Sequence, residues 1–373
     1  MSGRSSAPPG PSSPGDAAST RQAQPDLANL SCPLPLTHAH QIMLGHGSGG
    51  RLTHDLVRHL FLSTFDNPAL RQGDDAARLE IPSAGRLAVS TDSHIVSPLF
   101  FPGGDIGRLA VCGTVNDLAV MGAVPHWIAA GFILEEGLSL ETLERVVASM
   151  GAAAAEAKVV IVAGDTKVAE RGKADGIFIH TTGVGTIPPG RDVSGAGARP
   201  GDVILISGTL GDHGMAVLAA RGGLAFAVDV ESDVAPLNGL VEAMFAAGNG
   251  IHAMRDPTRG GLATTLNEIA GQSEVSIRLD EERLPVRPAV AAACEVLGFD
   301  PLYVANEGKL VAVVSPEAAD GVLAAMRSHP LGREACRIGE VEAGAESRVH
   351  LRTRLGTRRV VDMLSGEMLP RIC

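Results

Sequence analysis

Aromatic residues are scarce in this sequence: only 3% of its 373 residues are Phe, Trp or Tyr. Basic residues are also in the minority, because 31 Lys and Arg stand against 42 Asp and Glu and leave a formal net charge of −11. Proteins that bind nucleic acid need a basic surface for the phosphates, and those that bind single strands also use aromatic rings for stacking. The composition therefore argues against nucleic acid as a partner.

Long apolar runs are missing as well. No stretch approaches the roughly 20 apolar residues that cross a bilayer, so we expect no membrane partner. Residues 1–40 are rich in Ser, Pro, Gly and Ala and lack the apolar core of a secretory signal, and we predict a disordered extension there. The five cysteines are widely spaced without a Cys-x-x-Cys pair, which argues against a disulfide framework and structural zinc. We therefore expect a cytoplasmic protein.

The rest of the chain predicts two successive units that each mix strands with helices, an α/β or α+β arrangement. In the first unit we expect buried strands at 87–90, 159–163 and 177–182, and a helix that Ser139 caps at its N-terminus, with apolar residues at helical spacing from 140 to 150. In the second unit we expect strands at 203–207 and 310–315 and helices at 215–221, 262–270 and 316–329. Gly, Pro and Ala cluster around 190–200, which predicts domains at 41–190 and 196–345 and a tail at 346–373.

Acidic residues recur at the ends of apolar runs and in glycine-rich turns: Asp74, Asp75, Asp92, Asp117 and Asp165. Hard oxygen ligands of this kind hold Mg²⁺ against phosphate oxygens. Taken singly, each is more often a turn or capping residue. Their recurrence after apolar runs favours a magnesium and phosphate site.

A glycine-rich stretch, GHGSGGR, occupies residues 45–51. Glycines let backbone N–H groups approach a phosphate closely, so this stretch is a candidate phosphate loop. It matches neither the P-loop pattern nor the dinucleotide-binding fingerprint. By itself it is more typical of a flexible start to the folded part.

Three further residues have side chains suited to catalysis. Lys167 follows a predicted strand and could neutralise phosphate charge, while Glu307 precedes another strand and could accept a proton. Cys373 is the last residue of the sequence, and the twelve residues 362–373, if extended, could carry its thiol roughly 40 Å. Exposure and reach are what a group-carrying thiol needs. The alternatives are two surface residues and an incidental cysteine.

Together these motifs resemble the HypE family, the carbamoyl dehydratases of [NiFe]-hydrogenase maturation. The ending PRIC, combined with GDTKV and ANEGKL, is the most specific part of the resemblance. The matching stretches are HGSGGRL (46–52), STDSHIVSPLFFPGGDIGRLAVCGTVNDLAVMGA (90–123), FILEEGLSLETL (132–143), GDTKV (164–168), SGTLGDHG (207–214), RDPTRGGLA (255–263), ANEGKL (305–310) and PRIC (370–373).

The resemblance implies a two-domain PurM-like fold of the aminoimidazole-ribonucleotide synthetase superfamily, which dimerises through its N-terminal domains and binds ATP in a cleft associated with that dimer. It also implies a reaction. A HypF-like carbamoyltransferase places a carbamoyl group on the Cys373 thiol, ATP activates the amide oxygen, and loss of phosphate leaves a protein thiocyanate. A HypC–HypD-like complex that carries iron then receives the cyano group.

The resemblance also implies roles for individual residues. Glu307 is the expected base and Lys167 the expected cation, both beside the inserted tail that ends at Cys373. The expected ATP- and phosphate-binding residues are Gly47, Gly49, Gly50, Asp92, Asn116, Asp117, Asp165 and Thr166. The expected Mg²⁺ ligands are Asp75, Asp92, Asp117 and Asp165. The expected tail pocket contains Asp256, Thr258, Arg259 and Gly260.

Two other functions stay open at this point. One is a small-molecule ATP enzyme of the same superfamily, such as a selenophosphate synthetase or a thiamine-phosphate kinase, neither of which needs the ending PRIC. The other is a carrier without enzymatic activity that only displays Cys373. A carrier should bind no ATP, and a kinase should keep its ATP turnover when Cys373 is removed, so an ATPase assay distinguishes the three.

Overall fold

The computed structural model describes residues 40–72, 76–81, 85–222, 229–344, 346–364, 366 and 369–373. Residues His40–Cys373 form one unit. The predicted disordered extension lies outside the described residues, apart from His40. The candidate magnesium ligand Asp75 also lies outside them.

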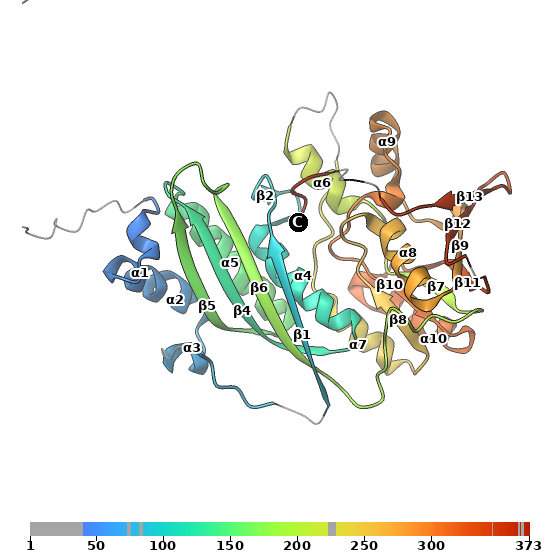
Figure 1. The fold of residues 1–373 in the computed structure, drawn as a ribbon, viewed down its shortest axis with the longest axis horizontal. Helices are drawn as coiled ribbons and strands as arrows, with labels where there is room; N and C mark the ends of the chain where they lie inside the picture. The colour runs from blue at the N-terminus through green and yellow to red at the C-terminus, as the bar shows by residue number, and fades with distance from the viewer. Residues whose placement is uncertain are drawn as a thin grey trace, which may run out of the picture. The chain divides into compact units, whose positions relative to one another are not determined.

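The N-terminal half contains a sheet, two long helices and several short helical turns (Figure 1). Its helices are the 3-10 turn Leu44–Gly47, α1 (Arg51–Leu56), the π-helical turn Val57–Phe61, α2 (Leu62–Phe65), α3 (Pro68–Gln72), α4 (Ile106–Val120) and α5 (Leu140–Ala157). Its strands are β1 (Arg86–His94), β2 (Phe100–Phe101), β3 (Gly104–Asp105), β4 (Val124–Glu135), β5 (Val160–Ala169) and β6 (Ile177–Ile187).

The four long strands of this half form a sheet in the order β1-β6-β4-β5, in which only β4 and β5 are parallel. Helices α4 and α5 pack together on one face of it (Figure 1). The predicted helix at 140–150 is confirmed as part of α5, and Ser139 caps it by accepting a hydrogen bond from the backbone N–H of Thr142 over 3.1 Å. Apolar residues at helical spacing therefore identified the buried side of α5 correctly.

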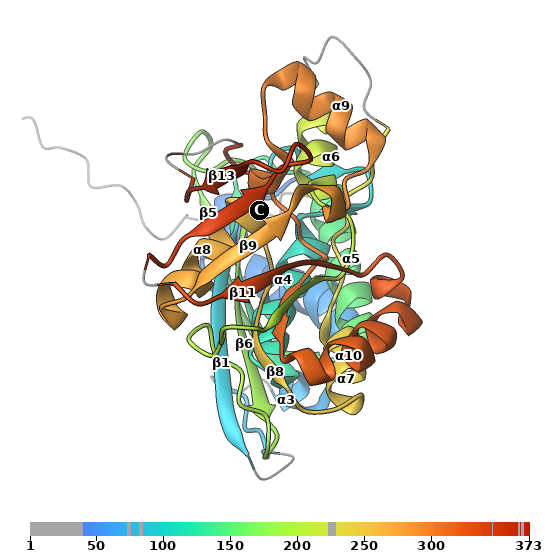
Figure 2. The ribbon, with the colours of Figure 1, turned by 90° about the vertical axis from the view of Figure 1, so that its right-hand side faces the viewer.

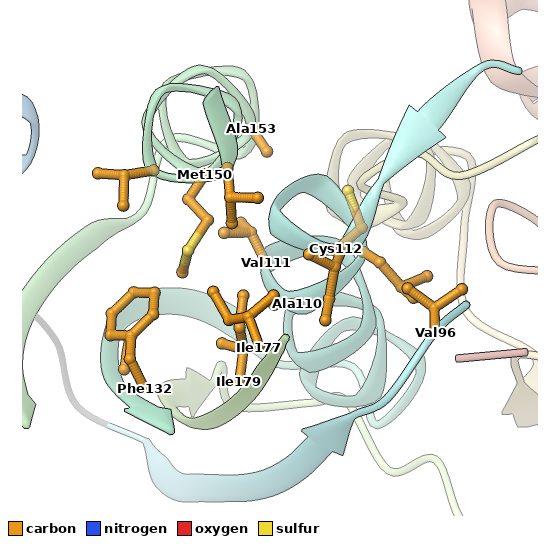
Figure 3. Packing of buried hydrophobic residues seen from close by; sticks show 14 of the residues in the cluster. Val96, Ala110, Val111, Cys112, Phe132, Met150, Ala153, Ile177 and Ile179 are labelled. Atoms are coloured by element: carbon orange, nitrogen blue, oxygen red, sulfur yellow. The ribbon is translucent and has the colours of Figure 1, made fainter. Parts of the chain in front are cut away.

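Helix α4 is buried on nearly every side because it lies between the first sheet and elements of the second half, α7 and β8. A helix that is apolar all round is typical of such a position. Asp105 caps its N-terminus by accepting hydrogen bonds from two backbone N–H groups. Figure 3 shows side chains of α4, α5 and the sheet meeting in one core. A Cβ atom on Gly107 would lie 2.3 Å from the Val146 carbonyl oxygen of α5, so glycine permits this close packing.

The other face of the first sheet is exposed and partly apolar: Val89 is 66% exposed, Leu87 56% and Ile133 46%. The prediction of a strand at 87–90 is therefore confirmed, but the prediction that this strand is buried is wrong. β1 is an edge strand whose apolar residues face the open side, and it continues to His94, so Asp92 lies within the strand. Similarly, the strand predicted at 159–163 continues to Ala169 and includes Asp165.

The second half contains a larger sheet with helices on both faces. Its helices are α6 (Asp212–Ala220), α7 (Asn238–Ala246), α8 (Gly261–Ser273), α9 (Pro288–Leu297) and α10 (Pro316–Ser328), with 3-10 turns at Glu281–Arg283, Pro301–Tyr303 and Pro330–Gly332. Its strands are β7 (Val203–Ile206), β8 (Ile251–Arg255), β9 (Ser276–Asp280), β10 (Val311–Val314), β11 (Cys336–Glu342), β12 (Val349–Arg352) and β13 (Arg358–Val361).

The strand order of this sheet, within the described residues, is β13-β12-β9-β11-β7-β10-β8. β7 and β10 are buried on both faces, since alternate residues contact α8 on one side and α7 with α10 on the other. Figure 2 shows α7 and α10 together beside this sheet. The predicted strands at 203–207 and 310–315 and the helices at 262–270 and 316–329 are confirmed.

Two predictions for the second half need correction. The helix expected at 215–221 begins three residues earlier, at Asp212, because Gly211 adopts the left-handed conformation (φ +82°) that precedes it. The tail expected from residue 346 begins later, because β12 and β13 belong to the sheet. Strands of four residues rich in Arg carry little alternation in hydrophobicity, and we therefore did not predict them.

The last residues of the chain return to the first half. Ile372 is 5% exposed and belongs to the same core as α4 and α5. The backbone N–H of Ile95, just beyond β1, donates to the terminal carboxylate of Cys373 over 3.1 Å. Figure 1 marks this end of the chain close to the end of β1. The chain terminus is thus held beside the first sheet.

Candidate active site

The thiol of Cys373 lies beside the carboxyl group of Glu307, close enough for each group to shift the pKa of the other. Burial raises the pKa of the Cys373 thiol far above its ordinary value, and the neighbouring Glu307 raises it further. A thiol in such surroundings stays protonated at neutral pH. The free thiol in this position is therefore a poor nucleophile.

Glu307 is 3% exposed, and its Oε1 atom has no hydrogen-bond partner within the described residues. Its backbone is held from both sides: its N–H donates to Asp233 Oδ1 over 3.1 Å, and its carbonyl oxygen accepts from Asn116 Nδ2 over 3.0 Å. Burial raises the pKa of the Glu307 carboxyl well above its ordinary range, and the carboxylates of Asp256, Asp233 and Asp92 add to the shift. The side chain is rigidly placed, and its affinity for a proton is high.

Three more carboxyl groups gather around this point, from Asp92 on β1, Asp117 on α4 and Asp256 at the end of β8. Burial and then the Asp117 charge raise the pKa of Asp256 to about 7, and burial also raises the pKa of Asp117. Ser90 Oγ donates to Asp117 Oδ2 over 2.6 Å and opposes that shift. Perturbed carboxyl groups in one place are typical of a functional site.

This cluster suits a cation that arrives with phosphate groups. Carboxyl groups that repel one another, and a buried Glu307 oxygen without a partner, are groups that a divalent cation or a hydrogen-bond donor would satisfy. Among the described residues, no three His, Cys, Asp or Glu are placed to hold a metal ion by themselves. Mg²⁺ in proteins commonly takes one or two carboxylates and completes its shell with water and substrate phosphate, so the donor set fits Mg²⁺ bound to a nucleotide.

Asp165, Thr166 and Lys167 do not lie in this cluster. They line a different cavity of about 200 Å³ at the β5 edge of the sheet, together with Gly47 and Gly49. Lys167 Nζ lies 3.0 Å from Asp165 Oδ1, and this hydrogen bond lowers the pKa of the Asp165 carboxyl. The rest of this cavity is lined mostly by apolar side chains. Gly50 lies just before α1 as its N-cap residue.

β1 and β5 are opposite edges of the sheet, and β6 and β4 separate them. With strands about 4.8 Å apart, Asp92 and Asp165 are about 14 Å from each other. Their side chains also face opposite sides of the sheet, since Asp92 lies near His94 toward α4, while the side chain of Asp165 is 70% exposed. Within a single chain Asp165 therefore lies apart from Asp92 and Asp117, and the prediction that all three hold one Mg²⁺ requires a second chain. The same geometry separates Lys167 from Glu307.

Asn116 also differs from the prediction. Its side chain is fully buried, its amide nitrogen donates to the carbonyl oxygens of Ala235 and Glu307, and its amide oxygen accepts from the Leu237 N–H. All of its polar atoms are engaged inside the protein. The structure thus makes Asn116 a clamp on the Glu307 loop, a role distinct from the predicted contact with ATP.

The predicted tail-pocket residues lie in the loop before α8. Arg259 and Gly260 line a cavity of about 250 Å³ together with Leu369 and Ile372 of the terminal segment. The backbone of Thr258 forms the turn that leads into α8. Asp256, which we expected in the same pocket, instead lies among the carboxyl groups. Its charge interactions with Asp117 and Asp92 place it there.

Three functional residues were not predicted from the sequence. Asp233 accepts from the Glu307 backbone and pairs with Lys309 over 3.2 Å, His213 contacts the Ile372 carbonyl, and Arg221 contacts the carbonyls of Pro370 and Arg371. Only His213 lies in a motif that we identified, SGTLGDHG. Asp233 lies in a stretch without regular secondary structure, and no sequence motif marks it. Arg221 is the C-cap residue of α6, a common position for arginine that by itself does not indicate a function.

Both halves match one family. Residues 73–187 match the N-terminal domain of AIR synthase-related proteins, and residues 199–352 match their C-terminal domain. The fold and the acidic cluster thus define an AIR synthase-related, PurM-like protein. Within the described residues, no helix is long and apolar enough to cross a membrane.

More specific relatives share most of the chain. The carbamoyl dehydratase HypE of Cupriavidus necator is 59% identical over 333 residues, which cover 89% of this chain and 95% of that protein. A crystal structure of hydrogenase maturation protein HypE in complex with ATP is 54% identical with a TM-score of 0.85, and covers 89% of this chain and 99% of that one. A chain in a crystal structure of a HypE–HypF complex is 51% identical, with a TM-score of 0.73. The match covers 83% of this chain and 99% of that one. The chain belongs to the HypE family of carbamoyl dehydratases.

Proposed function

We propose that this protein dehydrates a carbamoyl group carried on the sulfur of Cys373 and turns the thiocarboxamide into a thiocyanate for hydrogenase maturation. The placement of the Cys373 thiol beside the buried carboxyl group of Glu307 carries this proposal. A substituent on that sulfur would lie among Glu307, Asp92 and Asp256. Neither a kinase for a small molecule nor a passive carrier needs its last residue in an acidic cluster.

ATP is the proposed co-substrate, because it makes the amide oxygen a good leaving group as phosphate, and its Mg²⁺ would be held by Asp92, Asp117 and Asp256. A related HypE has been crystallised with ATP. Burial and neighbouring carboxylates raise the pKa of Asp256 to about 7 and the pKa of Asp117 above its ordinary value, which supports a cation bound among these groups. Asp75 remains a candidate ligand from the sequence alone.

Glu307 is the proposed base. The amide nitrogen must lose its hydrogens as the carbon–oxygen bond breaks, and Glu307 is the group in contact with the sulfur that bears the amide. Once cations offset the surrounding negative charge, Glu307 ionises, and its burial then makes it a strong proton acceptor. The two backbone hydrogen bonds from Asn116 and to Asp233 hold it in position.

Lys167 is the proposed cation for the phosphate in transfer, supplied by a second copy of the chain. Within one chain it lies at the far edge of the sheet from Glu307. The exposed apolar face with Val89, Leu87 and Ile133 supports a homodimer in which two such faces meet. A twofold arrangement that brings β5 of one copy near β1 of the other would place Lys167 and Asp165 beside the acidic cluster.

The proposed partners follow from the reaction. A HypF-like carbamoyltransferase loads the thiol, as the HypE–HypF complex of a relative suggests. A HypC–HypD-like complex that carries iron is the proposed acceptor of the cyano group. The free thiol is protonated where it lies, so loading requires the terminal segment to leave this position. We place all of these steps in the cytoplasm.

The test is the mass of the C-terminal peptide after incubation with carbamoyl phosphate, a HypF-like enzyme and Mg-ATP. The native protein should accumulate the cyano adduct, and Cys373→Ala should carry neither adduct while still binding ATP. Glu307→Gln keeps the shape of the side chain but removes the base, so it should accumulate the carbamoyl adduct and dehydrate it about 10²–10⁴-fold more slowly. Normal thiocyanate formation in Glu307→Gln would refute its role. Loading at another cysteine would refute the role of Cys373.

A further inference from the structure

The last four residues of the chain are held through their backbone. The terminal carboxylate of Cys373 accepts from the Ile95 N–H over 3.1 Å, and the carbonyl oxygen of Ile372 accepts from His213 Nε2 over 2.7 Å. The carbonyl oxygens of Arg371 and Pro370 both accept from Arg221 Nη2, the first over 2.7 Å. Each of these four residues therefore has a backbone oxygen that accepts from a donor in the body of the protein.

Arg221 connects the terminal segment to the first sheet. Its Nε atom donates to the Ser97 carbonyl oxygen over 2.8 Å, and the Ser97 N–H in turn donates to the Arg371 carbonyl over 3.2 Å. One guanidinium group therefore holds two antiparallel stretches of backbone together. A planar group with several donors in a fixed geometry suits this task better than an ammonium group.

His213 is fully buried, and its tautomer is determined by its partners. A carbonyl oxygen only accepts, so Nε2 must carry the hydrogen that it donates to Ile372. Nδ1 then accepts from Ser232 Oγ over 2.8 Å, and the ring packs edge-on against Phe101. The histidine is thus oriented from both ends toward the terminal segment.

The side chains of this segment contribute in other ways. Ile372 packs into the core, but Arg371 forms an ion pair with Asp175 in which both partners are about half exposed, and such pairs contribute little. The thiol of Cys373 lies beside Glu307, but the terminal carboxylate is held separately by Ile95. The backbone hydrogen bonds of the segment therefore do not involve the sulfur.

We propose that Arg221 and His213 are positioning residues that dock the terminal segment by its carbonyl groups and so present Cys373 to Glu307 in the free, carbamoylated and cyanated states alike. This inference rests on the proposed function for its catalytic meaning. Its physical content, a backbone clamp on residues 370–373, does not require that function. The chemical group on the sulfur would then change while the docked backbone stays the same.

The experiment measures docking without ATP or a partner protein. Hydrogen exchange at the Ile95 and Ser97 amides, and alkylation of Cys373 by iodoacetamide followed by mass spectrometry, both report the undocked fraction. Removing a hydrogen bond that involves a charged donor should raise that fraction about 10- to 100-fold in Arg221→Ala. His213→Ala should raise it as well, whereas His213→Gln, which keeps an N–H donor near Nε2, should stay close to the native protein.

Two further variants sharpen the test. Arg371→Ala removes only an exposed ion pair and should change the undocked fraction by less than about fivefold. Arg348→Ala removes a comparable exposed pair with Glu346, just before strand β12, and should change nothing. Unchanged exchange and alkylation in Arg221→Ala and in a folded His213→Ala would overturn the proposal. So would a carbamoylated native protein whose Ile95 and Ser97 amides exchange much faster than those of the free thiol form.

The same variants separate this proposal from the proposed function. If docking holds the thiol for catalysis, single-turnover dehydration in Arg221→Ala should fall in proportion to the docked fraction that remains, and Arg221→Lys should recover part of the docking and part of the rate. If the tail peptide never gains a cyano group even in the native protein, the proposed function fails, while the exchange data still decide on the clamp. Dehydration lost with docking intact would refute Arg221 as a positioning residue.

Discussion

The side-chain amide of Asn116 donates to the backbone carbonyl of Glu307 over 3.0 Å and so ties helix α4 of the first half to the loop before β10 of the second. The same side chain also bonds the backbone at Ala235 and Leu237. This hydrogen bond fixes the position of the Glu307 backbone relative to helix α4, which also carries Asp117. A residue buried inside the protein thus controls the geometry of the active site without touching a substrate.

We expect Asn116→Ala to destabilise the protein by about 2–4 kcal/mol, because it leaves three buried backbone groups without partners. Dehydration should fall as well, since the Glu307 loop loses one of its two anchors. Urea unfolding and the mass of the tail peptide measure the two effects. A variant with native stability but weaker ATP binding would instead favour the original prediction that Asn116 contacts ATP.

The open face of the first sheet is expected to be the homodimer interface. Val89→Lys should convert the dimer into a monomer, because a charge would be buried where two apolar faces meet. Analytical ultracentrifugation measures the oligomeric state. Leu355→Lys is a matched control, since Leu355 is 91% exposed but lies between β12 and β13. A Val89→Lys protein that remains dimeric would place the interface elsewhere.

A site completed by two chains makes a quantitative prediction for mixed dimers. Lys167→Ala and Glu307→Gln should each be nearly inactive alone. When the two proteins are mixed and exchange subunits, half of the dimers contain one of each, and one of their two sites then has both native residues. Dehydration should recover to about a quarter of the native activity. If both residues act within one chain, mixing should restore nothing.

The buried His213 predicts how stability depends on pH. Burial lowers the pKa of this imidazole below its ordinary value of about 6.5, although the Asp233 carboxylate and the Ile372 carbonyl oppose the shift. The unfolded chain therefore takes up a proton at a higher pH than the folded one. This contribution to stability is complete above about pH 6.5 and is lost as the pH falls through the folded pKa.

Urea unfolding at pH 7.5 and 5.5 tests this pH dependence. The native protein should lose more stability between the two values than His213→Gln, which keeps a donor for Ile372 but does not titrate. His350→Gln, on strand β12, serves as the control and should behave like the native protein. Equal losses in the native protein and His213→Gln would show that His213 does not titrate differently on folding.

Much of the fold followed from local patterns. The helix after Ser139 and the strands at 203–207 and 310–315 were predicted because apolar spacing and capping are properties of neighbouring residues. The errors fell where burial depends on distant segments. Leu87 and Val89 make β1 look like a buried strand, but they face the open side of an edge strand. The short strands β12 and β13 exist only because β9 offers them a partner.

The sequence predicted most of the residues of the site, but it did not predict which of them lie together. The sequence pattern pointed to Asp92, Asp117, Glu307 and Cys373 as chemical groups, and the fold brings them together. It also predicted that Asp165 belongs with them, although strand order places Asp165 at the opposite edge of the sheet. Asp256 joined the cluster through the packing of β8 and α4. Sheet order is a long-range property that no short motif contains.

By itself, the sequence determined which chemistry is available: carboxyl groups for a cation and phosphate, a lysine, a glutamate and a final cysteine. Only the tertiary structure decided how these groups act. The raised pKa values of Glu307 and Cys373 follow from burial and from neighbouring carboxylates, and the last residues contact Arg221 and His213, which are far from them in sequence. Solvent exclusion and contacts across long sequence separations arise only when the chain is folded.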